Sequence, residues 1–120
     1  MAGLSDGDRA RYARHLTLPQ VGEIGQSKLK HSRVFCVGAG GLGSPALLYL
    51  AAAGIGHLTV IDDDTIERSN LQRQILHADD DVGISKAESA MLRLRELNPT
   101  ISIEVYAERL TSENAMQLIQ

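Results

Sequence analysis

The sequence has few of the residues that characterise secreted, nucleic-acid-binding and membrane-spanning proteins. It has a single cysteine, Cys36, so it cannot form a disulfide within the chain, which fits a reducing cytoplasm. Its 15 aspartates and glutamates outnumber its 12 lysines and arginines, so there is no basic footprint for nucleic acid. No apolar run approaches the roughly 20 residues of a membrane span, and the polar N-terminal segment does not resemble a signal peptide. We therefore expect a cytoplasmic protein that contacts neither nucleic acid nor membrane.

The histidines also lack the spacing of a metal site. His15, His31, His57 and His77 show no ligand spacing with Cys36, so we predict no metal ligands in this chain. We expect most of these histidines at the surface or at strand ends. Cys36 lies in a predicted strand, where burial would make it a poor nucleophile.

Strands and helices alternate along the 120 residues, which suffice for one small domain with its own core. Apolar runs predict strands at 33–37, 57–61 and 101–107, helices at 44–53, 86–97 and from 111 onward, and a polar loop at 62–83 with a helical turn near 70–76. This order predicts an α/β fold, a Rossmann-like parallel sheet with flanking helices. Residues 1–31 are predicted to form an N-terminal helical arm interrupted by Pro19 and Gly22, and residues 32–120 form the N-terminal half of a Rossmann-like domain.

A glycine-rich turn follows the first predicted strand. Gly38, Gly40 and Gly43 fit the pattern G-x-G-x-x-G between a predicted strand and a predicted helix. We expect both of these elements to be buried, because each is apolar on nearly all sides. The first glycine permits the tight turn, the second lets a phosphate approach the backbone, and the third lets helix and strand pack closely. The free N–H groups of the helix then face the anion. The turn predicts a nucleotide phosphate site; the alternative is a glycine-rich turn without a ligand.

An acidic cluster follows the second predicted strand. Asp62 closes the strand, at the position where a carboxylate accepts hydrogen bonds from ribose hydroxyls in a Rossmann unit. A carboxylate at a strand end has no role in the core, so we expect Asp62 to serve the ligand. Asp64 is a second candidate, whereas Asp63 is more typical of a solvated loop.

Two cations further along suit a triphosphate. Ser85-x-x-Glu88 predicts a capping box and a helix that begins near Lys86. A lysine in the first turn opposes the helix dipole at a cost of up to about 1 kcal/mol, which a nearby phosphate would remove. Arg73 lies in the polar loop and would suit bidentate phosphate contacts. The alternative for both is a solvated surface charge.

These motifs together resemble those of a known family. The segments that carry the resemblance are Arg11 to His15, Gly38 to Ser44, Asp62-x-Asp64, Ser69 to Gln74 and Gly83 to Lys86. They resemble the MoeB/ThiF/HesA family, bacterial relatives of ubiquitin-activating enzymes, over nearly the whole chain. Within the family they are most similar to the molybdopterin-synthase adenylyltransferases.

The resemblance implies an ATP-dependent adenylyltransferase. Such an enzyme uses ATP and Mg²⁺ to activate the C-terminal glycine of a ubiquitin-like sulfur carrier ending in Gly-Gly, for thiocarboxylate formation in molybdopterin or thiamine biosynthesis. It implies catalytic roles for Arg73 and for Arg14, the latter reaching the triphosphate of the neighbouring subunit of a homodimer. Together with the positions derived from the motifs above, the resemblance gives a full set of expected nucleotide-binding residues. They are Gly38, Gly40, Gly41, Gly43, Asp62, Asp64, Ser69, Asn70, Leu71, Gln72, Arg73 and Lys86.

The chain departs from the family in what it lacks. The family's magnesium aspartate, its Cys-x-x-Cys zinc pair and its carrier-binding surface belong to later strands that these 120 residues do not contain. We therefore expect an incomplete adenylation domain: a truncated form, a split gene product or a pseudo-enzyme, with Phe35 and Val37 on an open strand edge. Whether the chain acts as an enzyme by itself is left open.

Two other functions fit part of the pattern. The glycine-rich turn and Asp62 also satisfy the fingerprint of an NAD(P)- or FAD-binding domain of an oxidoreductase, although hydride transfer does not call for Arg73 and Lys86. A non-catalytic module that holds a carrier protein or dimerises is the third hypothesis.

Overall fold

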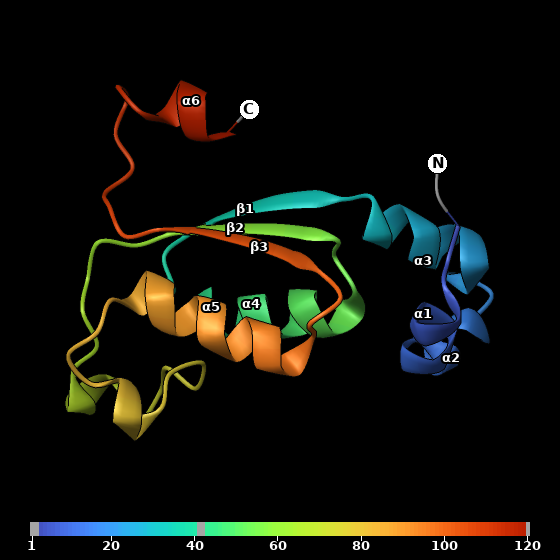
Figure 1. Cartoon of the computed structure of the whole chain (residues 1–120), viewed down its shortest axis with the longest axis horizontal. Helices are drawn as coiled ribbons and strands as arrows, with labels where there is room; N and C mark the ends of the chain where they lie inside the picture. The colour runs from blue at the N-terminus through green and yellow to red at the C-terminus, as the bar shows by residue number, and fades with distance from the viewer. Residues whose placement is uncertain (1–2, 41–42, 120) are drawn as a thin grey trace.

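The computed structural model describes residues 3–40 and 43–119 and contains one parallel sheet. The strands β1 (Arg33–Val37), β2 (His57–Ile61) and β3 (Ser102–Tyr106) lie in the order β1–β2–β3. Their register aligns Val37, Ile61 and Tyr106 at the carboxyl ends (Figure 1). The predicted strands and the α/β class are confirmed.

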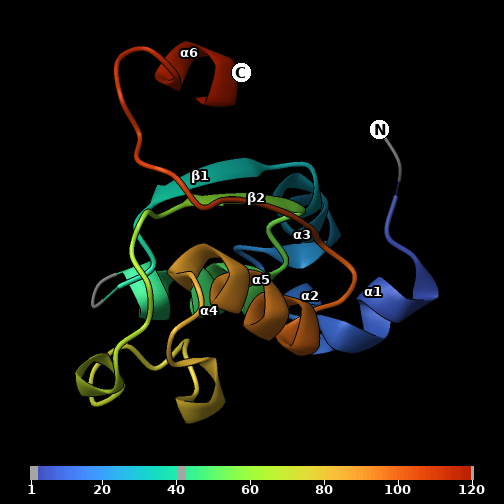
Figure 2. The ribbon, with the colours of Figure 1, turned by 60° about the vertical axis from the view of Figure 1, so that its left-hand side comes forward.

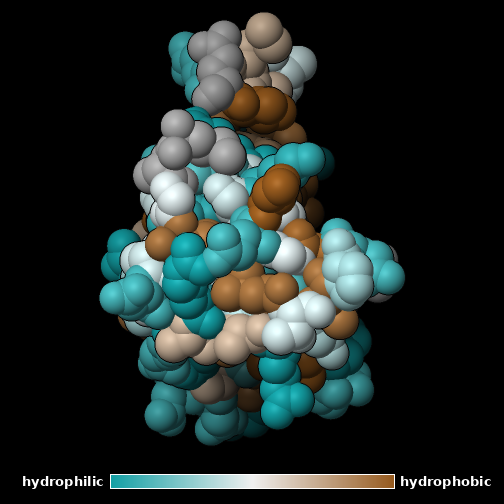
Figure 3. All heavy atoms as spheres, turned by 90° about the vertical axis from the view of Figure 1, so that its right-hand side faces the viewer, coloured by the Kyte–Doolittle hydropathy of each residue, from teal (hydrophilic) through white to brown (hydrophobic). Residues whose placement is uncertain are grey.

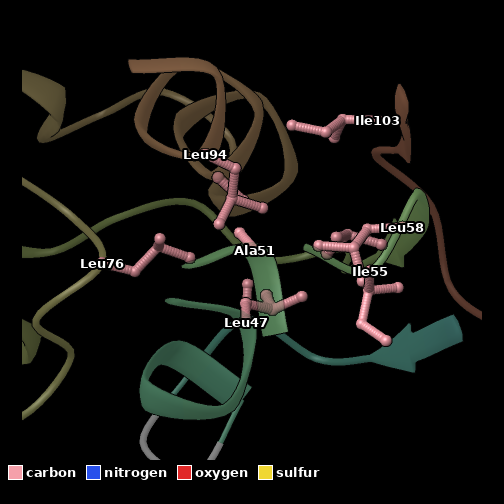
Figure 4. Close-up of a cluster of buried hydrophobic side chains, with 10 residues drawn as sticks. Leu47, Ala51, Ile55, Leu58, Leu76, Leu94 and Ile103 are labelled. Atoms are coloured by element: carbon pink, nitrogen blue, oxygen red, sulfur yellow. The ribbon is translucent and has the colours of Figure 1, made fainter. Parts of the chain in front are cut away.

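Two helices cover one face of this sheet, as Figures 1 and 2 show: α4 (Gly43–Ala53) and α5 (Lys86–Leu97). The core lies between them and the sheet (Figure 4). Its side chains are at most 6 % exposed and include Leu47, Ala51, Leu58, Leu94 and Ile103. Burial of each large apolar side chain contributes about 1.5–3 kcal/mol, which holds the layers together.

Two elements that we expected to be buried are only partly so. Tyr49 on α4 is 76 % exposed, so this helix buries one stripe although its sequence is apolar on nearly all sides. Val37 at the end of β1 is 62 % exposed, because β1 pairs with β2 and forms an edge of the sheet. The predicted open edge is confirmed, and the expectation of a buried strand is wrong. Cys36 is half-buried, and this burial raises the pKa of its thiol.

The N-terminal arm consists of three short helices, α1 (Asp6–Arg11), α2 (Ala13–Leu16) and α3 (Gly22–Lys30). The predicted interruption around Pro19 and Gly22 is confirmed, because α2 ends at Leu16 and α3 begins at Gly22, which adopts φ +57°. A further break, which the sequence did not indicate, lies at Tyr12 between α1 and α2, and the buried Tyr12 hydroxyl accepts a hydrogen bond from Asn98 Nδ2 at 2.7 Å. The end of the molecule where the arm lies mixes polar side chains with small apolar patches (Figure 3).

The polar loop and the last helix also differ in detail from expectation. The loop carries two 3₁₀ turns, η1 (Arg68–Asn70) and η2 (Asp79–Asp81), and the expected single helical turn near 70–76 is present where Gln74 N donates to Asn70 O at 2.9 Å. α5 begins at Lys86 as predicted, with Ser85 Oγ accepting from Glu88 N at 3.0 Å, but this is half of the expected capping box. α6 (Ala115–Ile119) starts four residues later than predicted, because Thr111 and Asn114 close a separate turn. Within the described ranges, no helix has both the length and the apolar character needed to cross a membrane.

Candidate functional site

The glycine-rich turn lies between the carboxyl end of β1 and the start of α4. Gly38 adopts φ +96° and donates its N–H to Ile61 O at 2.8 Å. A Cβ at Gly43 would lie 2.3 Å from Gly38 O, so this close approach of helix and strand requires glycine, as predicted. A Cβ at Gly40 would make only ordinary contact, 3.6 Å from Gln74 Nε2, so the phosphate role expected there stays a prediction. Gly41 lies outside the described residues.

Asp62 fixes this turn to the end of β2. Its Oδ2 accepts from Ala39 N and its Oδ1 from Asp64 N, both at 2.8 Å. The carboxylate therefore has a structural role that the sequence did not indicate. Each oxygen keeps a second lone pair, which leaves the expected ribose contact chemically possible.

A cavity of about 260 Å³ opens at the carboxyl end of the sheet. Ligands of open α/β sheets bind in such crevices. Arg109 is the one cation among its lining residues, and the sequence interpretation missed it although it follows β3 at the carboxyl edge. The lining consists of Val37, Gly38, Ile61, Asp62, Asp63, Asp64, Glu108, Arg109 and Leu110.

Lys86 lies beside this acidic cluster and is 7 % exposed. Its backbone N–H donates to Asp64 O at 2.9 Å, which attaches the start of α5 to the exit of β2. Its Nζ lies 3.6 Å from Asp64 Oδ2, beyond the usual 2.7–3.2 Å of a hydrogen bond. Lysines are almost never buried without a partner. Because Asp64 is too far away to accept a full hydrogen bond, the Lys86 ammonium can still donate hydrogen bonds to an anion.

The acidic cluster is a poor magnesium site by itself. The carboxylate oxygens of Asp62, Asp63 and Asp64 lie within 4.8 Å of one another. However, each oxygen of Asp62 already accepts one backbone N–H group, and a metal ion held by Asp64 would lie close to the buried ammonium of Lys86, 3.6 Å from Asp64 Oδ2, which repels a second cation. The described residues therefore do not supply a free set of ligands for the ion.

The polar loop is attached to the sheet at its base. Ile66 N donates to Ile84 O and Gly83 N donates to Ile66 O, both at 2.9 Å. Asn70 Oδ1 accepts from Glu67 N at 3.0 Å and stabilises η1. Arg73 is exposed and has no ion-pair partner among residues 3–40 and 43–119, so its charge is available. Ser69 and Gln72 are exposed, Asn70 and Leu71 are half-buried, and the roles of these four residues stay predictions.

His77 attaches the far part of this loop to the glycine-rich turn. It is 6 % exposed and is the exception to the expectation that most histidines lie at the surface or at strand ends, since His31 is exposed and His57 begins β2. Its Nε2 lies 2.7 Å from Ala39 O, and its Nδ1 lies 2.8 Å from Ser89 Oγ. Burial is the main cause that lowers the pKa of His77, and the nearby Lys86 lowers it further. The contact joins residues 38 positions apart, so no local pattern in the sequence could have revealed it.

Gln74 is the second buried polar residue that the sequence interpretation missed. It is 5 % exposed and lies against Gly40. In the described part of the chain, its Oε1 is the one buried side-chain acceptor without a hydrogen-bond partner.

Arg14 is not brought together with the other candidates within one chain. It is exposed on α2, at the end of the sheet opposite the glycine-rich turn (Figure 1). The role expected for it across a dimer stays a prediction.

Comparison with known proteins identifies a family and close relatives. The sequence model of the ThiF family matches residues 12–120. The SAMP-activating enzyme E1 of Haloferax volcanii is 54 % identical over 109 residues, which are 91 % of this chain and 40 % of that protein. A probable molybdopterin-synthase adenylyltransferase of Porphyra purpurea is 53 % identical over 92 % of this chain and 29 % of its own length. The sulfur carrier protein adenylyltransferase of Thermus thermophilus is 52 % identical over 92 % of this chain and 41 % of its own length.

Solved structures agree with these relatives. Escherichia coli tRNA N6-threonylcarbamoyladenosine dehydratase TcdA, in complex with ATP, superposes with a TM-score of 0.90 at 35 % identity, over 98 % of this chain and 48 % of that one. Escherichia coli MccB with AMPCPP and MccA gives a TM-score of 0.80 at 31 % identity, over 98 % of this chain and 34 % of that one. The chain thus spans less than half the length of the relatives and structures named here.

Proposed function

This chain belongs to the ThiF family, and from that premise we propose that it contributes the ATP-binding part of a site that adenylates the C-terminal glycine of a ubiquitin-like sulfur carrier. The name of the Thermus relative, a sulfur carrier protein adenylyltransferase, supports a carrier protein as the substrate class. The TcdA complex supports ATP rather than a nicotinamide or flavin dinucleotide as the nucleotide.

The burial of Lys86 is the observation on which the assignment of ATP depends. A lysine at 7 % exposure, 3.6 Å from its one carboxylate partner in the described residues, is ready to hold a phosphate. In the proposal, the turn from Gly38 to Gly43 and the start of α4 receive the phosphates. Arg73 and Lys86 offset their negative charge, and Asp62 and Asp64 accept from the ribose hydroxyls.

The chemistry that follows is acyl adenylation. A carboxylate oxygen of the carrier's C-terminal glycine attacks the α-phosphorus of ATP, the bond to the bridging oxygen of the β-phosphate breaks, and pyrophosphate leaves. Positioning and charge stabilisation supply the acceleration, because no protein nucleophile is needed. A sulfur donor then displaces AMP and leaves a thiocarboxylate.

No step of this proposal passes through a metal, because the described carboxylates do not form a free magnesium site. The need for Mg²⁺, the homodimer in which Arg14 reaches its neighbour, the cytoplasmic location and the choice of molybdopterin or thiamine pathway stay predictions within the proposal.

Calorimetry with ATP and with NAD tests the nucleotide. We expect ATP to bind and NAD not to, and Lys86→Ala to lower ATP affinity by roughly 1.5–3 kcal/mol, the usual contribution of hydrogen bonds to charged groups. Lys28→Ala is the matched control, since Lys28 is exposed on α3. Pyrophosphate–ATP isotope exchange with a carrier ending in Gly-Gly then tests the reaction. Preference for NAD, or exchange unaffected by Lys86→Ala, would overturn the proposal.

A further inference from the structure

Both backbone groups of Ala39 are held by side chains from distant parts of the chain. Ala39 is fully buried, its N–H donates to Asp62 Oδ2 at 2.8 Å, and its C=O lies 2.7 Å from His77 Nε2. A trans peptide is planar and directs its C=O and N–H to opposite sides. The contact with His77 therefore directs the N–H of Gly40, in the same peptide unit, away from His77. That N–H has no acceptor among the described residues.

A chain of buried groups fixes the His77 ring in turn. Ser89 Oγ lies 2.8 Å from His77 Nδ1 and 3.0 Å from Asp81 Oδ2, and Arg93 Nη2 donates to the same oxygen at 3.0 Å. Ser89 is fully buried, and Asp81 is 6 % exposed. Burial raises the pKa of Asp81, but hydrogen bonds from Ala78 N–H and Ser89 and the charge of Arg93 outweigh this and lower it, so the carboxylate stays ionised.

We propose that His77 is a positioning residue for the nucleotide phosphate. It holds the Ala39–Gly40 peptide so that Gly40 N–H faces the anion, and Ser89 and Asp81 on its other side keep the ring in place. The inference rests on the proposed function, because it takes a nucleotide phosphate as the anion. The hydrogen on Nε2 makes this bond in either protonation state of the ring, since Ala39 O can only accept.

Two substitutions separate positioning from mere folding. His77→Leu removes the donor to Ala39 O, whereas His77→Gln keeps an amide donor near the place of Nε2. We expect His77→Leu to weaken ATP binding roughly tenfold, as the loss of one well-placed hydrogen bond does, and His77→Gln to recover most of it. Adenosine, which has no phosphate, should bind both variants as it binds the parent chain. His31→Leu is the matched control, because His31 is exposed at the end of α3.

Hydrogen exchange at the Ala39 N–H, measured without nucleotide, keeps this test independent of the proposed function. His77→Leu should accelerate this exchange, and His77→Gln should slow it again, whether or not ATP is the ligand. If the parent chain does not bind ATP but hydrogen exchange responds in this way, the proposed function fails, whereas the positioning of the Ala39–Gly40 peptide by His77 is supported. Unchanged exchange and ATP affinity in His77→Leu, or equal losses of ATP and adenosine binding, would overturn the inference. If His77→Leu does not fold, Ser89→Ala takes its place, with a smaller effect of the same kind expected.

Discussion

Gln26 and Gln74 are both buried amide side chains, one near each end of the sheet, and their hydrogen bonding differs. At the arm end, Gln26 Nε2 donates to Ala53 O and Gln26 Oε1 accepts from His15 Nδ1, both at 2.9 Å. At the carboxyl end, Gln74 Oε1 has no partner in the described part of the chain.

Other buried polar groups at the two ends show the same contrast. At the arm end, Asn98 Nδ2 donates to Tyr12 Oη at 2.7 Å and to Ala51 O at 2.8 Å. At the carboxyl end, Lys86 Nζ lies 3.6 Å from Asp64 Oδ2, beyond hydrogen-bond distance. Buried polar groups in stable structures are paired. The arm end is thus complete within the protein, whereas the carboxyl end keeps pairing capacity for a ligand.

The largest effect should come from disrupting the arm end, where the buried polar groups are paired. Asn98→Ala leaves Tyr12 Oη and Ala51 O without their donor, and a buried group left unpaired costs roughly 1–3 kcal/mol. We expect the free energy of unfolding in urea to fall by about 2–4 kcal/mol, with the ATP affinity of the folded protein unchanged. Gln20→Ala, which removes an exposed amide in the turn before α3, is the control. A large loss of ATP affinity in Asn98→Ala would break the division between the two ends.

Asp62→Ala tests the carboxyl end of the sheet, where polar groups keep hydrogen-bonding capacity for a ligand. It should lower ATP affinity by roughly 1.5–3 kcal/mol, because hydrogen bonds between ribose and a charged carboxylate are lost. It should also lower stability modestly, since Ala39 N and Asp64 N lose their acceptor. Titration calorimetry and urea unfolding measure the two effects. Glu104→Ala, an exposed carboxylate on β3, should change neither, and a loss of stability alone in Asp62→Ala would make its role structural.

The two glutamines give the sharpest matched pair. Gln26→Leu should destabilise by roughly 1–3 kcal/mol, because Ala53 O and His15 lose their partners. Gln74→Leu should stay within about 1 kcal/mol of the parent, since its Oε1 has no hydrogen bond to lose. Equal losses in the two variants, measured by urea unfolding, would mean that Gln74 is as fully paired as Gln26.

The smallest effect concerns pH. Because burial lowers the pKa of His77 in the folded protein, the unfolded chain binds this proton more readily. The contribution of His77 to the free energy of unfolding should therefore decrease as pH falls through the ordinary histidine value of about 6.5. His77→Gln should remove this slope between about pH 7.5 and 5.5, the range around that value. A slope that is the same in both proteins would assign it to another group.

The sequence predicted the elements whose signals are local. The strands at 33–37 and 57–61 follow from short apolar runs, and the start of α5 follows from the cap at Ser85. Gly43 was predicted correctly because close packing of helix and strand excludes any side chain there. The family motifs added the nucleotide candidates in the loop.

What the sequence could not predict depends on contacts between distant residues. The hydroxyl of Tyr12, between α1 and α2, pairs with Asn98, 86 positions away, and the buried His77 contacts Ala39 O, 38 positions away. The exposure of Val37 and Tyr49 depends on what packs beside β1 and α4, which an apolar composition does not specify. Arg109 sits in the cavity because of the direction the chain takes after β3.

The closed base of the polar loop bears on the speed of binding. Backbone bonds between Ile66, Gly83 and Ile84 hold its two ends together, and His77 holds its interior against Ala39, so these contacts are made within the protein. Ordering a side chain on association costs about 0.5–1.5 kcal/mol, a cost that contacts formed during folding reduce. Nucleotide association should then be limited by diffusion and charge steering rather than by loop closure, and it should follow a single exponential in stopped-flow mixing.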